Sequence, residues 1–333
     1  MSEGTLGDVT SSRTESLALA ENLVRSGSDP DQVLQAARIF ALEEHRERAI
    51  ETLRQGILAH SRHAGLLTLL GDLLSRTGAF EEADLYFRQA LESAPTDVEV
   101  RFRHGLHHAR QGQWQAARLS YQEVVRLDPG HVRGWVNLGL TQAEVGERRE
   151  AVAALLRAVT LDPACAEAHS NLGVLYAESG MRAEAVEEFR RAVALHPDSS
   201  EAHFNLGWAL LAEDDVEQAE TMLLASVRLD PANAESLYAL ALLHLKVGGN
   251  SRAVAELKQA IEIRPDDARL HYHLGVAYNN QDAVDQAILA LESATRLNPE
   301  DARVHRLLGV AYDKKELPAR AREAYRRAAA LNG

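Results

Sequence analysis

The segment AEAHSNLGVLYAESGMRAEAVEEFRRAVALHPDS, residues 166–199, decides how the chain is read, because its pattern returns at a fixed spacing. One proline recurs every 34 residues: Pro95, Pro129, Pro163, Pro197, Pro231, Pro265 and Pro299. A fixed period of this length indicates a protein built from stacked repeats. If the proline takes position 32 of a 34-residue frame, repeats begin at residues 64, 98, 132, 166, 200, 234, 268 and 302.

Small and large residues alternate in a regular way inside this frame. Position 8 is glycine in every repeat except the one with Ala241, position 20 is always alanine, and position 24 is always large. Positions 4, 7, 8 and 11 share one face of a first helix, and positions 20, 24, 27 and 28 share one face of a second. Proline at position 32 ends the second helix. We therefore expect the two helices to approach closely at positions 8 and 20, with the large residue filling the space beside them.

These residues resemble the tetratricopeptide repeat (TPR) family, in which Leu-Gly at positions 7–8, an aromatic at 11, Ala at 20 and 27, and Pro at 32 form the consensus. The resemblance extends from Ala64 to the C-terminus. It implies an all-α fold, a right-handed superhelical solenoid of antiparallel helix pairs, with about eight clear repeats. A single pair cannot bury its apolar face alone, so neighbouring pairs must stack.

The N-terminal part departs from this pattern. We expect residues 1–13 to be disordered, because they are rich in Ser, Thr and Gly. Residues 14–63 are predicted to form a capping helix and one degenerate repeat, in which Ala49 and Leu53 hold positions 20 and 24. Ala37 replaces glycine at position 8 there, and Ser61 stands where the proline belongs. Residues 64–333 are predicted to form the TPR solenoid.

Composition limits the function classes. The net charge of −13 argues against nucleic-acid binding, which needs a basic surface. No apolar run is long enough to span a membrane, the N-terminus lacks the features of a secretory signal, and Cys165 is the only cysteine. We therefore expect a cytoplasmic protein with no membrane insertion and no internal disulfide.

No arrangement of residues points to catalysis. The spacing of His104, His107 and His108 is compatible with zinc chelation, but positions 7 and 11 are core positions, so packing of His104 and His108 between helices is favoured. No phosphate-binding loop and no nucleophile–base motif is found. The sequence thus predicts no metal, no cofactor, no catalytic residue and no enzyme activity.

The family resemblance implies that the first helices line a concave surface, with positions 2, 5, 6, 9, 12 and 13 pointing into it. Position 6 carries three successive asparagines, Asn137, Asn171 and Asn205. An asparagine amide both donates and accepts hydrogen bonds, so this ladder can hold the backbone of an extended peptide. The alternative is that asparagine is simply common at this exposed position of the family.

Large apolar residues at positions 5 and 9 extend this candidate surface. A contiguous apolar strip that faced only water would be unexpected, so it indicates an interaction site. Trp208, beside Phe204 and Tyr238, is the first candidate for a binding hot spot. The alternative is that tight curvature buries some of these side chains against the neighbouring first helix. The remaining apolar candidates are Phe102, Leu140, Val174, Leu242 and Tyr272, and the arginines Arg76, Arg103 and Arg110 lie toward the start of the same face.

The sequence therefore predicts a non-catalytic adaptor that binds an extended peptide or a helix of a partner protein in its concave groove. Capture of chaperone C-termini is disfavoured, because no repeat carries the Lys at position 5 and Asn at position 9 that such TPR domains use. The alternative function is a structural scaffold that forms homo-oligomers through its terminal repeats.

Overall fold

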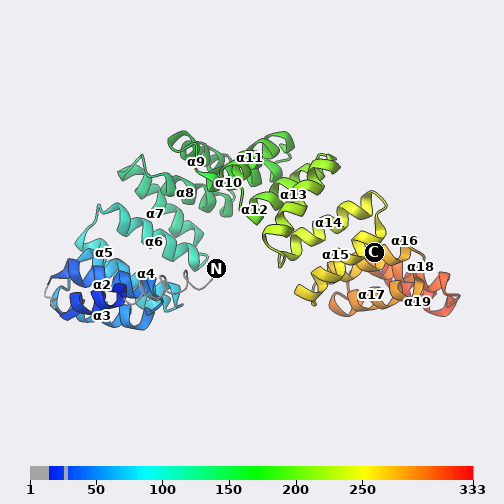
Figure 1. Ribbon diagram of the computed structural model, residues 1–333, viewed down its shortest axis with the longest axis horizontal. Helices are drawn as coiled ribbons and strands as arrows, with labels where there is room; N and C mark the ends of the chain where they lie inside the picture. The colour runs from blue at the N-terminus through cyan, green and yellow to red at the C-terminus, as the bar shows by residue number, and fades with distance from the viewer. Residues whose placement is uncertain (1–14, 26–28, 333) are drawn as a thin grey trace, which may run out of the picture. The chain divides into compact units, whose positions relative to one another are not determined.

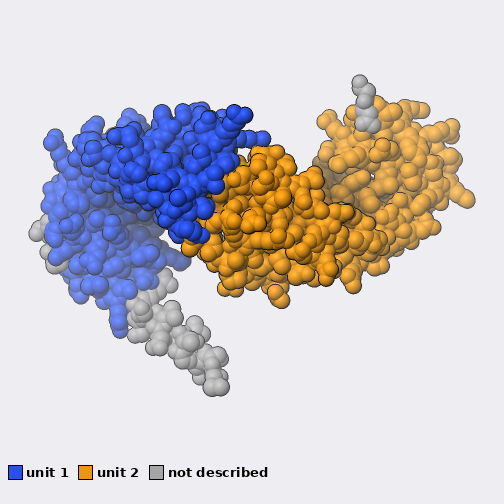
Figure 2. Space-filling model, turned by 90° about the horizontal axis from the view of Figure 1, so that it is seen from above, with its two compact units in different colours: residues 1–163 blue, residues 164–333 orange. Residues whose placement is uncertain are grey.

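The computed structural model describes residues 15–25 and 29–332, and these residues form helices joined by short turns, with no strand among them. The chain divides into two compact units, residues 1–163 and residues 164–333 (Figure 2). The predicted disorder of residues 1–13 concerns residues outside the described part of the chain.

Unit 1 is a row of helix pairs preceded by a helix at residues 15–25 (Figure 1). Even-numbered helices are the first members of the pairs and odd-numbered helices the second. Each first helix packs on its own second helix and on the second helix of the preceding pair, and α2, α4 and α6 also contact one another in succession. The helices are α2 (Pro30–Leu42), α3 (Arg46–Ala59), α4 (Ala64–Arg76), α5 (Phe80–Ser93), α6 (Val98–Arg110), α7 (Trp114–Leu127), α8 (Val132–Glu144) and α9 (Arg148–Leu161).

Unit 2 repeats the arrangement with five pairs. The first helices α10, α12, α14, α16 and α18 contact one another in succession, in addition to their contacts with second helices. The predicted all-α fold of stacked antiparallel helix pairs is confirmed. The helices are α10 (Ala166–Glu178), α11 (Arg182–Leu195), α12 (Ser200–Ala212), α13 (Val216–Leu229), α14 (Ala234–Lys246), α15 (Asn250–Ile263), α16 (Ala268–Asn280), α17 (Val284–Leu297), α18 (Ala302–Lys314) and α19 (Pro318–Asn332).

The close approach of the paired helices occurs at the predicted glycine. A Cβ atom placed on Gly173 of α10 would lie 2.6 Å from Cε1 of Phe189 on α11. The same construction on Gly105 of α6 would lie 2.7 Å from Cε1 of Tyr121 on α7. Position 8 thus lies directly against the large residue at position 24, as the sequence predicted.

The turn inside each pair uses a left-handed backbone at position 15. Gly78, Gly112, Gly146, Gly180 and Gly248 all have positive φ angles there. Where glycine is missing, the same conformation is forced on other residues, with φ of 65° at Glu44 and 61° at Glu316. An L-residue with a side chain is strained in this region, so the first helix ends here at some cost in stability.

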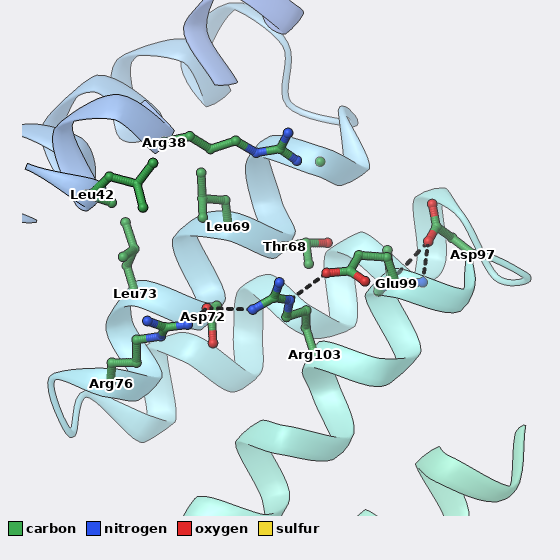
Figure 3. A pocket seen from close by; sticks show the side chains of 13 residues that line it. Arg38, Leu42, Thr68, Leu69, Asp72, Leu73, Arg76, Asp97, Glu99 and Arg103 are labelled. Carbon is green, nitrogen blue, oxygen red and sulfur yellow. Dashed lines mark hydrogen bonds and ion pairs between the residues drawn. The ribbon is translucent and has the colours of Figure 1, made fainter. Parts of the chain in front are cut away.

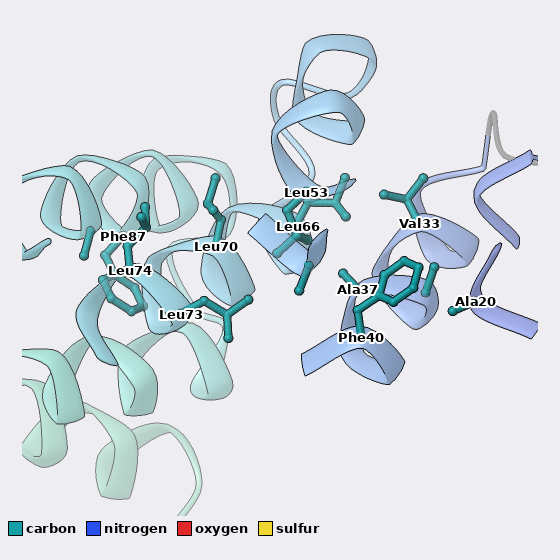
Figure 4. Close-up of a cluster of buried hydrophobic side chains, with 13 residues drawn as sticks. Ala20, Val33, Ala37, Phe40, Leu53, Leu66, Leu70, Leu73, Leu74 and Phe87 are labelled. Carbon is teal, nitrogen blue, oxygen red and sulfur yellow. The ribbon is translucent and has the colours of Figure 1, made fainter. Parts of the chain in front are cut away.

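The degenerate repeat is fully built into the core of unit 1. Ala20 from residues 15–25, Phe40 from α2 and Leu53 from α3 are completely or almost completely buried in one cluster with Leu66 and Leu70 of α4 (Figure 4). Gly56, at position 27, is tightly covered, since a Cβ there would lie 2.6 Å from Cγ1 of Val33. The sequence departs from the consensus at these positions while keeping the packing.

Candidate functional site

An exposed apolar surface lies on the first helices of unit 2. Trp208 of α12 is 44% exposed and stacks on the half-buried Phe204, with ring centroids 6.2 Å apart. Val174, at the same frame position one repeat earlier on α10, is 38% exposed. Leu242, one repeat later on α14, is half-buried. We call Val174, Phe204, Trp208 and Leu242 the Trp208 surface.

Two of the three asparagines accompany this surface. The Nδ2 of Asn205 on α12 lies 3.5 Å from Oγ of Ser170 on α10, a long hydrogen bond between neighbouring first helices. The half-buried Asn171 side chain makes no hydrogen bond to any residue that the structure describes. Asn137 lies in unit 1, and its Nδ2 donates to the carbonyl oxygen of Arg133 one turn earlier, at 2.8 Å. One of the two N–H donors of Asn137 is therefore already used within its own helix.

The structure corrects the expectation for Phe102. This side chain is 1% exposed, so it offers no accessible surface. Its ring packs on Tyr121 and His131, with centroids 5.7 and 5.1 Å away, and the guanidinium of Arg133 covers it. Position 5 of this repeat faces the next pair of helices, which is the burial by a neighbouring helix that the sequence left open as an alternative.

Tyr238 is a second correction, because only 8% of it is exposed. Its hydroxyl lies 3.3 Å from Nδ1 of His273 on α16, and the Arg269 guanidinium lies over its ring. Tyr272 is half-buried and lies under the guanidinium of Arg303. Leu140 of α8 remains 36% exposed, in unit 1. Of the predicted residues in unit 2, the accessible ones are therefore the Trp208 surface, Asn171, Asn205 and part of Tyr272.

Unit 1 carries a hollow that the sequence did not single out. A cavity of about 540 Å³ lies between α2, α4 and α6 (Figure 3). Its floor is formed by α4 residues at positions 2, 5, 6, 9 and 13 of the frame, the same positions that were predicted to face inward. We call it the arginine cavity. Its main lining residues are Arg38, Leu42, Thr68, Leu69, Asp72, Leu73, Arg76, Glu99 and Arg103.

A buried carboxylate organises the arginines at this cavity. Asp72 is 2% exposed, and its oxygens lie 3.0 Å from Arg76, 3.3 Å from Arg103 and 2.8 Å from Arg110. Arg103 also pairs with Glu99 at 2.6 Å. A buried charge is stable only when it is paired and hydrogen-bonded, and Asp72 meets that condition with three guanidinium groups.

Of the three histidines of α6, His104 packs against α5 as expected, whereas His107 and not His108 is the fully buried one. His107, at position 10, is fully buried and lies 3.1 Å from Oγ of Ser75. The His104 ring lies 5.5 Å from the Phe87 ring and is tilted by 37° to it, while Nδ1 of the more accessible His108 lies 2.7 Å from Oε1 of Gln113 in the turn. Burial, followed by the nearby His108, lowers the pKa of both His104 and His107 to about 4, although Asp84 opposes this shift. Among the described residues, no three potential ligands are grouped to hold a metal ion.

The stacked pairs, the glycine against the large residue at position 24, and the left-handed turn together define a TPR solenoid protein. Residues 34–98 match the tetratricopeptide repeat family itself. Residues 67–180 match the cilia and flagella-associated protein 70 middle TPR-like domain. Residues 133–333, more than half of the chain, match the cilia and flagella-associated protein 70 C-terminal domain, and the chain belongs to this family.

Solved structures with a similar fold include a chain of the APC/C hetero-tetramer Cut9–Hcn1, with a TM-score of 0.56 and 20% identity, covering 92% of this chain and 61% of that one. A TPR protein from Parabacteroides merdae ATCC 43184 has a TM-score of 0.55 and 18% identity, covering 71% and 93%. YrrB, described as a TPR protein with an unusual peptide-binding site, has a TM-score of 0.49 and 21% identity, covering 55% and 95%. At these identities the first two likenesses show the fold alone.

No curated protein matches the chain.

None of the described helices combines the length and the apolar character that crossing a bilayer requires.

Proposed function

We propose that the protein is an adaptor that holds a segment of a partner protein against the Trp208 surface of unit 2. The observation that carries this proposal is the exposure of Trp208, 44%, next to Phe204 on a first helix. A tryptophan held in place by a second aromatic ring is a typical hot spot, because it buries a large area on binding and loses little side-chain entropy.

The neighbouring amides complement this apolar contact. Asn171 has an unused amide and Asn205 has only a long hydrogen bond, so both can donate to and accept from the backbone of a partner segment. Each such hydrogen bond contributes about 1 kcal/mol net. The apolar residues thus supply affinity and the asparagines fix the orientation of the bound segment, with no catalytic step required.

The test uses the full chain as bait for affinity capture, with bound proteins identified by mass spectrometry. The double variant Asn171→Ala/Trp208→Ala should lose the captured partner while its circular dichroism stays unchanged. The matched control is Leu224→Ala, because Leu224 is 51% exposed on α13 and lies on the second helix of the same pair. Capture of the same partner by the double variant would reject the Trp208 surface as the binding site.

Light scattering separates this proposal from the scaffold alternative. An adaptor of this kind gives a constant mass as the protein concentration rises. Assembly through terminal repeats gives a mass that grows with concentration and is insensitive to Trp208→Ala, and that result would favour the scaffold.

A further inference from the structure

The arginine cavity of unit 1 carries an inference that goes beyond the proposed function, because it lies in the other unit and has a different chemistry. Its walls come from α2 and α6 and its floor from α4, so three successive first helices contribute side chains (Figure 3). A volume of about 540 Å³ lies within the range of sites that take a ligand or several side chains of a partner.

An unsatisfied hydroxyl lies in this cavity. Thr68 is 6% exposed, and its Oγ1 has no hydrogen-bond partner. A buried hydroxyl without a partner is costly, because it has lost its water and gained nothing in return. Thr68 also stands at position 5, where other repeats carry Phe102, Phe204 or Tyr238, and its small side chain leaves the hollow open. The site therefore has room for a ligand and a polar atom left for the ligand to satisfy.

Among the arginines that line the cavity, Arg38 is the one whose charge is not paired with any described residue. Among the carboxylates, Asp72 is enclosed by its three arginines, and Asp97 accepts hydrogen bonds from the backbone N–H groups of Glu99 and Val100 at the start of α6. Glu99 is paired with Arg103. Arg38, by contrast, is exposed and makes no ion pair with any residue that the structure describes. Arg38, Arg76 and Arg103 are thus balanced by Asp72, Asp97 and Glu99 in the lining, and Arg38 is the guanidinium left to face an anionic group of a ligand.

Apolar side chains lie next to the unpaired Arg38. Leu42 lies one helical turn after Arg38 on α2 and is 82% exposed, and Leu69 and Leu73 of α4 lie across from it (Figure 3). Residues four apart on a helix lie on the same face, so a cation and a leucine are presented side by side. A ligand that uses both must carry a carboxylate next to an apolar side chain.

We propose that the arginine cavity binds an acidic amphipathic segment of a partner protein. Its apolar side chain packs on Leu42, Leu69 and Leu73, and its carboxylate faces Arg38, with Thr68 as a further hydrogen-bonding group. Charge complementarity selects this partner: a basic segment would be repelled by Arg38, and a purely apolar segment would leave Arg38 unpaired and Thr68 unsatisfied.

The test measures fluorescence anisotropy of labelled probe peptides of about 15 residues, roughly four helical turns, titrated with the full chain. One probe carries Leu and Glu at helical spacing, a second replaces Glu with Lys, and a third replaces Leu with Gln. The first probe should bind about tenfold more tightly than either of the others, and its affinity should fall with added salt. Equal binding of the acidic and basic probes would overturn the proposal.

Matched variants locate the binding. Arg38→Glu and Leu42→Asp should each weaken the acidic probe about tenfold, and Thr68→Val about threefold, because a hot-spot contact or a hydrogen bond is lost. The controls are Arg157→Glu, an exposed arginine on α9, and Leu58→Asp, a leucine on α3 that is 87% exposed. These controls and Trp208→Ala should leave the affinity unchanged. Loss of acidic-probe binding in Trp208→Ala, with Arg38→Glu unaffected, would overturn the cavity and leave the Trp208 surface standing.

Other occupants give distinct results that would each overturn the partner assignment. If inorganic phosphate displaces the probe at a concentration similar to that of the probe, the ligand of the arginine cavity is a small anion. A rise in probe affinity after deletion of residues 1–14 would assign the chain's own N-terminal segment. A concentration-dependent increase in mass that Leu42→Asp abolishes would assign a second copy of the chain.

Discussion

Replacing Gly173 by alanine tests whether the close approach at position 8 holds the helix pair together. The new Cβ would lie 2.6, 2.7 and 2.9 Å from Cε1, Cδ1 and Cζ of Phe189, all shorter than van der Waals contact. The Phe189 ring is 3% exposed, so it has no solvent space to move into. We therefore expect α10 and α11 to be forced apart.

The change in unfolding free energy caused by Gly173→Ala is the difference between two opposing contributions. Overpacking a core costs about 1–3 kcal/mol, whereas replacing glycine by alanine inside a helix gains about 1 kcal/mol. Gly173→Ala should therefore destabilise the protein by about 1 kcal/mol. In a Phe189→Ala background the whole ring is absent, so only the gain from helix propensity remains. The coupling between the two substitutions should then equal the overpacking cost, about 1–3 kcal/mol.

The assay is urea unfolding followed by circular dichroism for the four members of this double-mutant cycle. Repeat proteins can unfold in steps, so the free energies are compared only where the m-values agree. Ala177→Gly, on the exposed side of α10, measures the propensity difference in the same helix. A coupling energy below about 0.5 kcal/mol would show that the two sites are independent and would refute the packing argument.

Two further substitutions are predicted to raise stability. Glu316→Gly should stabilise the protein by about 0.5–1 kcal/mol in urea unfolding, because φ is 61° there and the exposed side chain makes no hydrogen bond or ion pair with the residues that the structure describes. A loss of stability would contradict the strain argument. His104→Leu, which restores the leucine of position 7, should reduce the loss of stability between pH 7 and pH 5. The pKa of His104 is lowered to about 4 when folded, so from pH 6.5 downward the unfolded chain binds a proton that the folded chain does not, and stability falls by up to about 1.4 kcal/mol per pH unit. An identical pH dependence of the urea midpoint in the variant and the parent would exclude this role.

The fold was predictable because each decisive contact recurs at a fixed place in the frame. Gly173 against Phe189 and Gly105 against Tyr121 are separated by the same 16 positions, and a residue with positive φ always follows the first helix at position 15. The period thus encodes the helix pair, its turn and its stacking together.

The site was only partly predictable, because accessibility depends on side chains from the next repeat. Trp208 and Phe102 were both expected on the inner face, yet Trp208 is exposed while Phe102 is buried under His131 and Arg133. The arginine cavity was missed because its signal is the absence of bulk, a threonine at position 5. A search for small residues at inner positions, beside an unpaired arginine, would have found it.

The restriction of helix contacts to near neighbours has a consequence for how such a chain can change. In the described part of each unit, the main contacts of each helix are with the next helix or the next but one. A hairpin can therefore be duplicated, lost or rewritten with effects confined to the hairpins beside it. Natural variation can lengthen this protein in whole modules, and each module can acquire its own ligand preference without rebuilding those further along.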